Sequence, residues 1–188
     1  MGNHGARDIV TIKKGPVVRT KTGAYKLALP KDHREVLTHL ITQLRDSLLN
    51  TTDDASLRRL FPTAYHNDAK KDAEYQRLMR EELLASRLSS IEISLSVIAR
   101  HDELSEAEID AFARSINSLR LVLGTTLDIA ESDYGAQNIP DKTSAGSVDE
   151  KTNSIEIEQD DEEPVQRELY EYLGWILEWT VGAQSEAL

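Results

Sequence analysis

The 188-residue chain contains no cysteine, few aromatic residues and no long apolar run. The absence of cysteine excludes structural disulfides, thiolate metal sites, a cysteine nucleophile and any thiol-based redox switch in this polypeptide. Only two Phe, two Trp and six Tyr are present, so we expect a mostly aliphatic core. No apolar run approaches the roughly 20 residues that a membrane span needs, and the first residues lack the basic-then-apolar order of a signal peptide. We therefore expect a cytoplasmic protein.

Motifs for catalysis and for cofactor binding are also missing. The sequence has no Gly-rich dinucleotide or phosphate-loop motif, no His-Glu-x-x-His zinc motif and no Gly-x-Ser-x-Gly nucleophile motif. Its five histidines are scattered, and no two of them lie four residues apart. Adjacent carboxylates such as Glu81 and Glu82 point in different directions on a helix and are typical of a solvated face. The sequence thus predicts no enzyme, no cofactor and no metal site.

Charge is distributed unevenly along the chain. The formal net charge is -11, with +6 in residues 1–31 and -10 in residues 128–163. The basic N-terminal arm could be neutralised by the acidic segment or drawn to an external polyanion, and the first interpretation is the simpler one. The nucleic-acid-binding candidates on this arm are Lys13, Lys14, Arg19, Lys21 and Lys26. The alternative is that these cations only keep an edge strand soluble.

The first 30 residues combine β-branched residues with glycine. The pattern predicts a β-hairpin whose strands cover residues 18–20 and 25–29, with Gly23 supplying the positive φ of the turn. A hairpin alone is marginally stable, so it must pack on helices or gain a third strand. Residues 154–158 alternate with period two and are the candidate third strand.

Helical periodicity takes over after Pro30. Asp32 and Glu35 resemble a capping box and predict a helix over residues 33–49. A short helix is predicted over residues 55–60, where Pro62 prevents its continuation. Another helix is predicted to begin near Asp68.

The long segment after Asp68 has neither Gly nor Pro up to about residue 100. Its apolar stripe slips by five residues between Leu78 and Leu83, which predicts a break near residues 79–82 and two helices instead of one. Ser105 and Glu108 form a capping box, and the helix that they begin is expected to close at Gly124.

Residues 131–163 are polar and acidic and are expected to form a largely flexible insertion. Pro164 then opens a last helix that ends near Gly182. Its apolar residues cover more than one face, which indicates either a homodimer or a buried central helix. The dimer-interface candidates are Tyr170, Tyr172, Trp175 and Trp179.

The predicted fold class is mainly α, formally α+β. We expect a bundle of about five helices with a small N-terminal antiparallel hairpin. Residues 1–130 and 164–188 form a single domain in this prediction, and the acidic insertion separates its two parts.

Four strings in the chain resemble a known family. They are Leu57-Arg58-Arg59-Leu60-Phe61-Pro62-Thr63-Ala64-Tyr65, Glu74-Tyr75-Gln76-Arg77-Leu78, Asn117-Ser118-Leu119-Arg120-Leu121-Val122-Leu123-Gly124-Thr125 and Tyr172-Leu173-Gly174-Trp175-Ile176. They look like an actinobacterial family first described as a domain of unknown function and later named actinomycete oxidative-stress regulator, AosR. The resemblance covers residues 24–180 apart from the acidic segment.

The resemblance implies a regulator that acts with the transcription machinery in response to oxidants, with a sigma factor or RNA polymerase as its protein partner. A role that depends on thiol oxidation does not carry over to a chain without cysteine. The partner-binding candidates are Arg58, Arg59, Phe61, Tyr65, Arg77 and Arg80. The arginines could equally form ion pairs with neighbouring glutamates. A direct DNA-binding regulator that uses the basic arm is the alternative.

Overall fold

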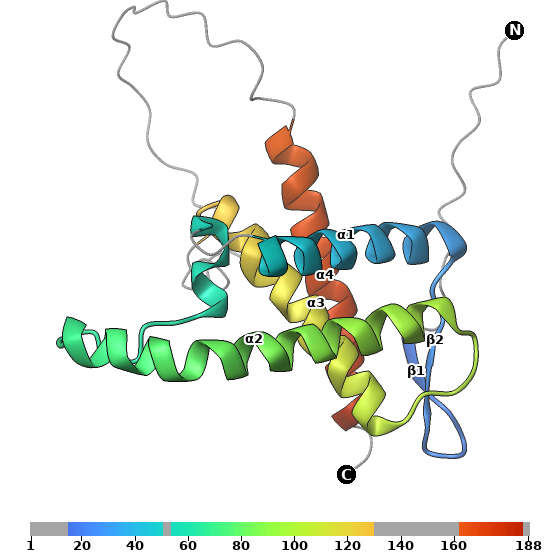
Figure 1. The fold of residues 1–188 in the computed structure, drawn as a ribbon. Coiled ribbons are helices and arrows are strands. Elements are labelled where there is room, and N and C mark those ends of the chain that lie inside the picture. Colours follow the sequence, from blue (N-terminus) through green and yellow to red (C-terminus); the bar gives the residue numbers. More distant parts are fainter. Residues whose placement is uncertain (1–14, 51–53, 130–161, 186–188) are drawn as a thin grey trace, which may run out of the picture.

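The computed structural model describes residues 15–50, 54–129 and 162–185, and Figure 1 shows their arrangement. The elements are β1 (Val17–Arg19), β2 (Tyr25–Leu27), α1 (Lys31–Asn50), the 3-10 helix η1 (Ala55–Leu60), α2 (Ala69–Ala99), α3 (Glu106–Thr126) and α4 (Glu162–Ser185). The predicted mainly α fold with one small N-terminal hairpin is therefore confirmed. Lys13, Lys14, the candidate strand at 154–158 and most of the acidic insertion lie outside the described residues.

The hairpin forms as the sequence indicates. Val17 pairs with Leu27 and Arg19 with Tyr25 in antiparallel register, and Gly23 adopts a φ of 85° in the turn. The hairpin also pairs with a third segment, through one residue of the loop between α2 and α3. Leu104 exchanges two backbone hydrogen bonds with Tyr25, at 2.9 and 2.7 Å. The hairpin is thereby attached to the helices.

The core is mostly aliphatic, as the scarcity of aromatics predicts. The helix α3 contacts α2, α4 and η1, so it lies at the centre of the packing. Phe112 is the one phenylalanine among the fully buried side chains. The other large ones are Leu37, Ile41, Leu60, Ile91, Ile98, Leu104, Ile109, Ile116, Leu173 and Ile176.

Two of the four predicted starts of the long helices follow their local signals, and α4 begins at Glu162, two residues before the predicted start at Pro164. Ser105 and Glu108 form the predicted capping box of α3, and Asp68 caps α2 by accepting from the amide of Lys71 at 3.0 Å. The capping box predicted at Asp32 is wrong, because α1 already begins at Lys31. There the carbonyl of Pro30 accepts the first helical bond from Arg34, at 3.1 Å.

Gly124 does not close α3, contrary to the prediction. The helix continues to Thr126, and the amide of Leu127 bonds the carbonyl of Leu123. A Cβ placed on Gly124 would lie 3.0 Å from the Tyr170 ring of α4. The glycine therefore serves a close approach between two helices and not a helix end.

The predicted break near residues 79–82 is also wrong, because α2 is one helix of 31 residues. Without Gly or Pro the backbone has no reason to stop there. The slip in the apolar stripe instead marks a change in what α2 packs against. Five of its last ten residues are buried in the core, whereas Leu78 is 60% exposed.

Arg34 joins three parts of the fold. Its side chain is buried and donates to the carbonyl oxygens of Leu27 at 2.7 Å and Leu29 at 3.2 Å. It also donates to the carbonyls of Ile98 and Arg100 at the end of α2, the second at 2.8 Å. Burial lowers the pKa of this guanidinium. One side chain of α1 thus caps α2 and holds the chain that leaves the hairpin.

Candidate partner-binding surface

The first two-thirds of α2 contribute only partly buried side chains, such as Leu84 and Leu88, to the packing against the core. None of residues 61–89 is buried, while Ser90, Ile91, Ser94, Val97 and Ile98 are. In Figure 1 the beginning of α2 extends on the left beyond the ends of α1, α3 and α4. We call residues 69–89 the α2 arm. Because most helical stability in proteins comes from packing, an arm of this length needs other support.

The loop before α2 supplies that support on one side of the arm. The carboxylate of Asp72 accepts from the amides of Ala64 at 2.7 Å and Tyr65 at 3.1 Å. The side-chain amide of Gln76 donates to the backbone carbonyl of Pro62 at 2.9 Å. Asp72 and Gln76 are one turn apart, so both face the loop. The proline corner of the Leu-Phe-Pro-x-Ala-Tyr string therefore folds back along the arm.

Aromatic contacts continue this support toward the core. The guanidinium of Arg80 lies 4.4 Å from the centre of the Phe61 ring, and that of Arg87 lies 5.9 Å from it. Farther out, Tyr65 and Tyr75 meet edge to face with ring centres 6.1 Å apart. Such contacts contribute about 0.5–1.5 kcal/mol each.

Arg87 links the arm to α3 and η1. It donates to the carbonyl of Leu60 at 2.6 Å and to the hydroxyl of Ser118 at 3.2 Å. Burial lowers the pKa of this guanidinium as well. Its position explains why arginine follows the corner string at this distance along the sequence.

The structure brings together only part of the predicted partner-binding set. Phe61, Tyr65 and Arg80 lie along the braced side of the arm. Arg58 and Arg59 instead face the end of α3, where the first lies 3.9 Å from the Asp128 carboxylate and the second donates to the carbonyl of Ile129 at 2.7 Å.

Arg77 is exposed on the arm. The sequence did not predict that Leu78 is exposed, because its pattern assigned this residue to the apolar stripe of the helix. The five-residue gap between Leu78 and Leu83 was the one sign in the sequence that Leu78 lies on a different face.

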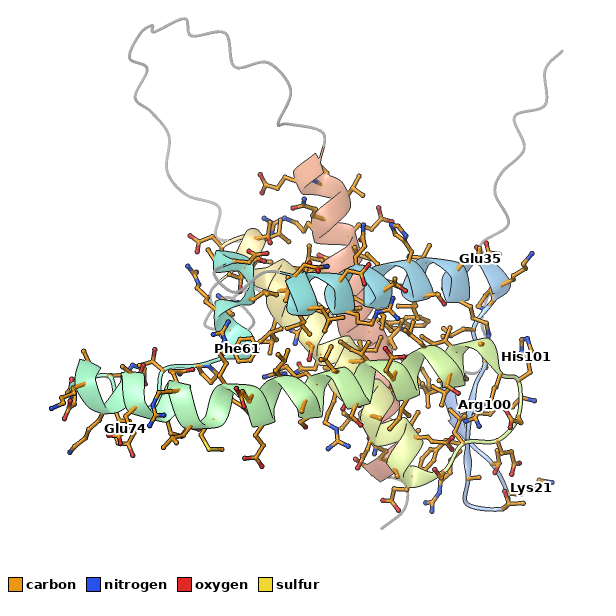
Figure 2. The ribbon with its side chains drawn as sticks, in the orientation of Figure 1. Lys21, Glu35, Phe61, Glu74, Arg100 and His101 are labelled. Atoms are coloured by element: carbon orange, nitrogen blue, oxygen red, sulfur yellow. The ribbon has the colours of Figure 1, made fainter. Side chains whose placement is uncertain are left out.

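The described nucleic-acid-binding candidates on the hairpin are Arg19, Lys21 and Lys26, and one acidic side chain contacts the hairpin turn. Lys21, at the turn in Figure 2, and Lys26 are exposed. The hydroxyl of Thr22, next to Lys21, donates to the carboxylate of Glu103 at 2.9 Å. This contact places a negative charge against the tip of the hairpin. Arg19 is half-buried in β1.

The aromatic residues of α4 make contacts within their own chain. Arg120 of α3 lies 4.9 Å from the centre of the buried Tyr170 ring. The Tyr172 hydroxyl lies 2.8 Å from Nδ1 of His33, and its ring stacks on Trp175. Burial, with the Asp32 charge, raises the pKa of Tyr172 far above the usual range. These contacts involve three of the four residues predicted for a dimer interface.

Trp179, 43% exposed, covers the start of the hairpin. A Cβ placed on Gly15 would lie 2.1 Å from its ring, so only glycine permits this approach. The homodimer stays a prediction.

The fold and this surface define a small, mainly helical protein with a braced helical arm. A family described as a domain of unknown function, DUF2017, matches residues 14–184, and the chain belongs to that family. No curated protein and no solved structure has detectable similarity to the chain. Within the described residues, no helix is long and apolar enough to cross a membrane. Those same residues contain no cluster of three or more metal-ligating side chains.

Proposed function

We propose that this chain is a cytoplasmic regulator of the oxidative-stress transcription type. It acts by contact with a protein of the transcription machinery, a sigma factor or RNA polymerase, and not by catalysis. The resemblance of its four strings to the AosR family supports this role. Because the chain has no cysteine, it has no thiol switch of its own.

The observation that carries the proposal is the α2 arm. This 21-residue stretch of helix has no buried residue and packs against the core through the partly buried Leu84 and Leu88, while the loop before it holds its outer part in place through hydrogen bonds and ring contacts. An ordered projection with exposed Tyr65 and Leu78 is typical of a surface that another protein covers.

The alternative, direct DNA binding through the basic arm, has weaker support among the described residues. The carboxylate of Glu103 contacts the hairpin turn and opposes phosphate binding there. The cations Lys13 and Lys14 lie outside the described residues.

Capture of the tagged full chain from its own host, with and without nuclease, tests the proposal. We expect sigma factor or polymerase subunits to be retained equally in both, as measured by quantitative mass spectrometry. Replacing Leu78, which is 60% exposed, with Asp should reduce their recovery, whereas the same change at Leu49, 59% exposed at the end of α1, should not. Loss of these subunits on nuclease treatment would mean that DNA is the bridge. Recovery of neither subunit would refute the proposal.

A further inference from the structure

The last helix has a face that the described chain covers only in part. Trp179 is 43% exposed, and Trp175, one turn before it, is half-buried. Glu171 and Glu178 are exposed on the same side of α4 and form no ion pair within the described ranges. A helix brings residues at these spacings onto one side. We call these four residues the tryptophan face of α4.

The start of the hairpin covers one edge of this face. Gly15 is buried, and so are Pro16 and Val17, which follow it. A Cβ placed on Gly15 would lie 2.1 Å from the Trp179 ring, so this contact requires a glycine. The described part of the chain therefore begins against Trp179. Chain continuity brings the residue before Gly15 next to the tryptophan face.

The direction of β1 shows from which side the chain reaches this contact. β1 packs against α4, and in Figure 1 both run downward, β1 toward the hairpin turn and α4 toward its C-terminal end. The chain therefore enters β1 from the side of Trp175. Six residues of extended chain span about 20 Å, whereas Trp179 and Glu171 lie about 12 Å apart along the helix axis. The six residues before Gly15 are thus long enough to follow the whole face.

Those six residues have the composition that the face requires. Residues 9–14 combine three large aliphatic side chains with two cations, namely Ile9, Val10, Ile12, Lys13 and Lys14. Aliphatic side chains bury the apolar surface of indole rings, and lysines complement exposed carboxylates. We propose that residues 9–14 dock in cis on the tryptophan face of α4. The link at Gly15 gives them an effective concentration on the order of millimolar, so a weak contact suffices.

This contact gives the basic N-terminal arm an occupant within its own chain. It places Lys13 and Lys14 beside the carboxylates of α4, so a polyanion must displace the docked segment before it reaches these cations. The arm is then held by α4, and not by the acidic insertion. The contact is independent of the proposed function, because it involves neither the α2 arm nor its partner.

Tryptophan fluorescence of the full chain tests the contact. The chain has two tryptophans, so Trp175→Phe leaves Trp179 as the only reporter and keeps an aromatic ring on the face. In this background, Ile9→Ser/Ile12→Ser should shift the Trp179 emission to longer wavelength. Because the ring returns to water, we also expect its acrylamide quenching constant to rise at least about twofold.

The matched control is Ile155→Ser/Ile157→Ser in the same background, which makes the same two changes in the acidic insertion. It should leave the emission and the quenching as they are in the Trp175→Phe chain. Unchanged fluorescence in the Ile9→Ser/Ile12→Ser variant, or equal changes in both double variants, would overturn the proposal. Circular dichroism confirms that each variant keeps its helix content.

Photo-crosslinking identifies the occupant without any change in α4. The full chain carries p-benzoylphenylalanine in place of Ile12, and ¹⁵N-labelled and unlabelled chains are mixed in urea and refolded together. We expect crosslinks from position 12 to residues 171–182, with both peptides carrying the same isotope. Pairs of mixed isotope would show that a second copy supplies the segment, and crosslinks to residues 130–161 would show that the acidic insertion holds it. Either result, or no crosslink to α4, overturns the proposal.

Discussion

Arg34 donates a hydrogen bond to the backbone carbonyl of Arg100 at 2.8 Å, which ties the first turn of α1 to the residue that follows α2. The same guanidinium also serves Ile98, Leu27 and Leu29. All four acceptors are backbone carbonyls. One buried cation therefore satisfies carbonyl groups from two separate segments of the chain.

Replacement of Arg34 by Met should strongly destabilise the fold. The change leaves buried carbonyls without donors, so we expect the free energy of unfolding to fall by about 3 kcal/mol. Urea denaturation followed by circular dichroism measures it. Arg34→Lys keeps the charge but cannot reach every acceptor, and it should show an intermediate loss. A loss below about 0.5 kcal/mol in the Met variant would contradict the role assigned to these bonds.

Alanine substitution at two glycines inside helices should change the free energy of unfolding in opposite directions. Gly182→Ala meets no atom within 4 Å and should raise the free energy of unfolding by about 0.5–1 kcal/mol, because alanine is the better helix former. Gly124→Ala places its methyl 3.0 Å from the Tyr170 ring and 3.2 Å from Arg59.

The Tyr170 ring is buried and carries Arg120 against its face, so it cannot move away easily. We expect Gly124→Ala to lower the free energy of unfolding by about 1 kcal/mol, despite its better helix propensity. Thermal unfolding of the two variants side by side provides the comparison. Stabilisation by both substitutions would show that α3 and α4 adjust at this contact.

Glu108 should make the stability of the protein fall in acid. The backbone amide of Ser105 and the side chain of Arg100 hold the pKa of this carboxyl below its ordinary value. A lowered pKa in the folded state means that the stabilisation is present above the unfolded pKa and is lost as the pH falls through the folded one.

The Glu108→Gln variant should therefore be less stable than the unchanged chain at pH 7, and the difference should shrink below about pH 4. Urea titrations at a series of pH values measure this difference. Asp110→Asn on the same helix serves as the control for a general charge effect. A difference that stays constant with pH would contradict the prediction.

The α2 arm should open more readily than the rest of its helix. No residue of the arm is buried, whereas five of the last ten residues of α2 are. We expect amides of residues 73–89 to exchange with deuterium faster than those of residues 90–99, as measured by mass spectrometry. Equal protection along α2 would show that the arm unfolds only with the core. In complex with the partner, protection of the arm should rise.

The helix starts at Ser105 and Asp68 could be predicted because their signals are local. A capping side chain and the amide that it accepts lie within three residues of each other. The hairpin was predictable for the same reason, since Gly23 sits between two short β-branched and aromatic stretches.

The error at residues 79–82 has a different origin. The apolar pattern reports which side of a helix is covered, but not by what. In α2 the covering element changes from the preceding loop to the core, so the stripe slips although the backbone continues. The role of Arg34 was likewise invisible in the sequence, because its acceptors lie up to 66 residues away.

The candidate surface was predicted in part. Phe61 lies against Arg80 and Tyr65 lies against Tyr75, but these contacts brace the arm. The face around Leu78 follows from knowing which side of α2 the loop covers. That knowledge requires the contacts of Asp72 and Gln76, which no local pattern contains.

The separation of the arm from the core has a consequence for how such a chain can change over time. Substitutions at Leu78 or Glu81 remove no buried contact, so they carry little of the folding penalty that restricts core positions such as Ile98. Under the proposed function, the residues of α2 that recognise a partner and the residues that stabilise the fold are different sets. A protein built this way can acquire a new partner by mutation of one exposed helix face while its scaffold stays the same.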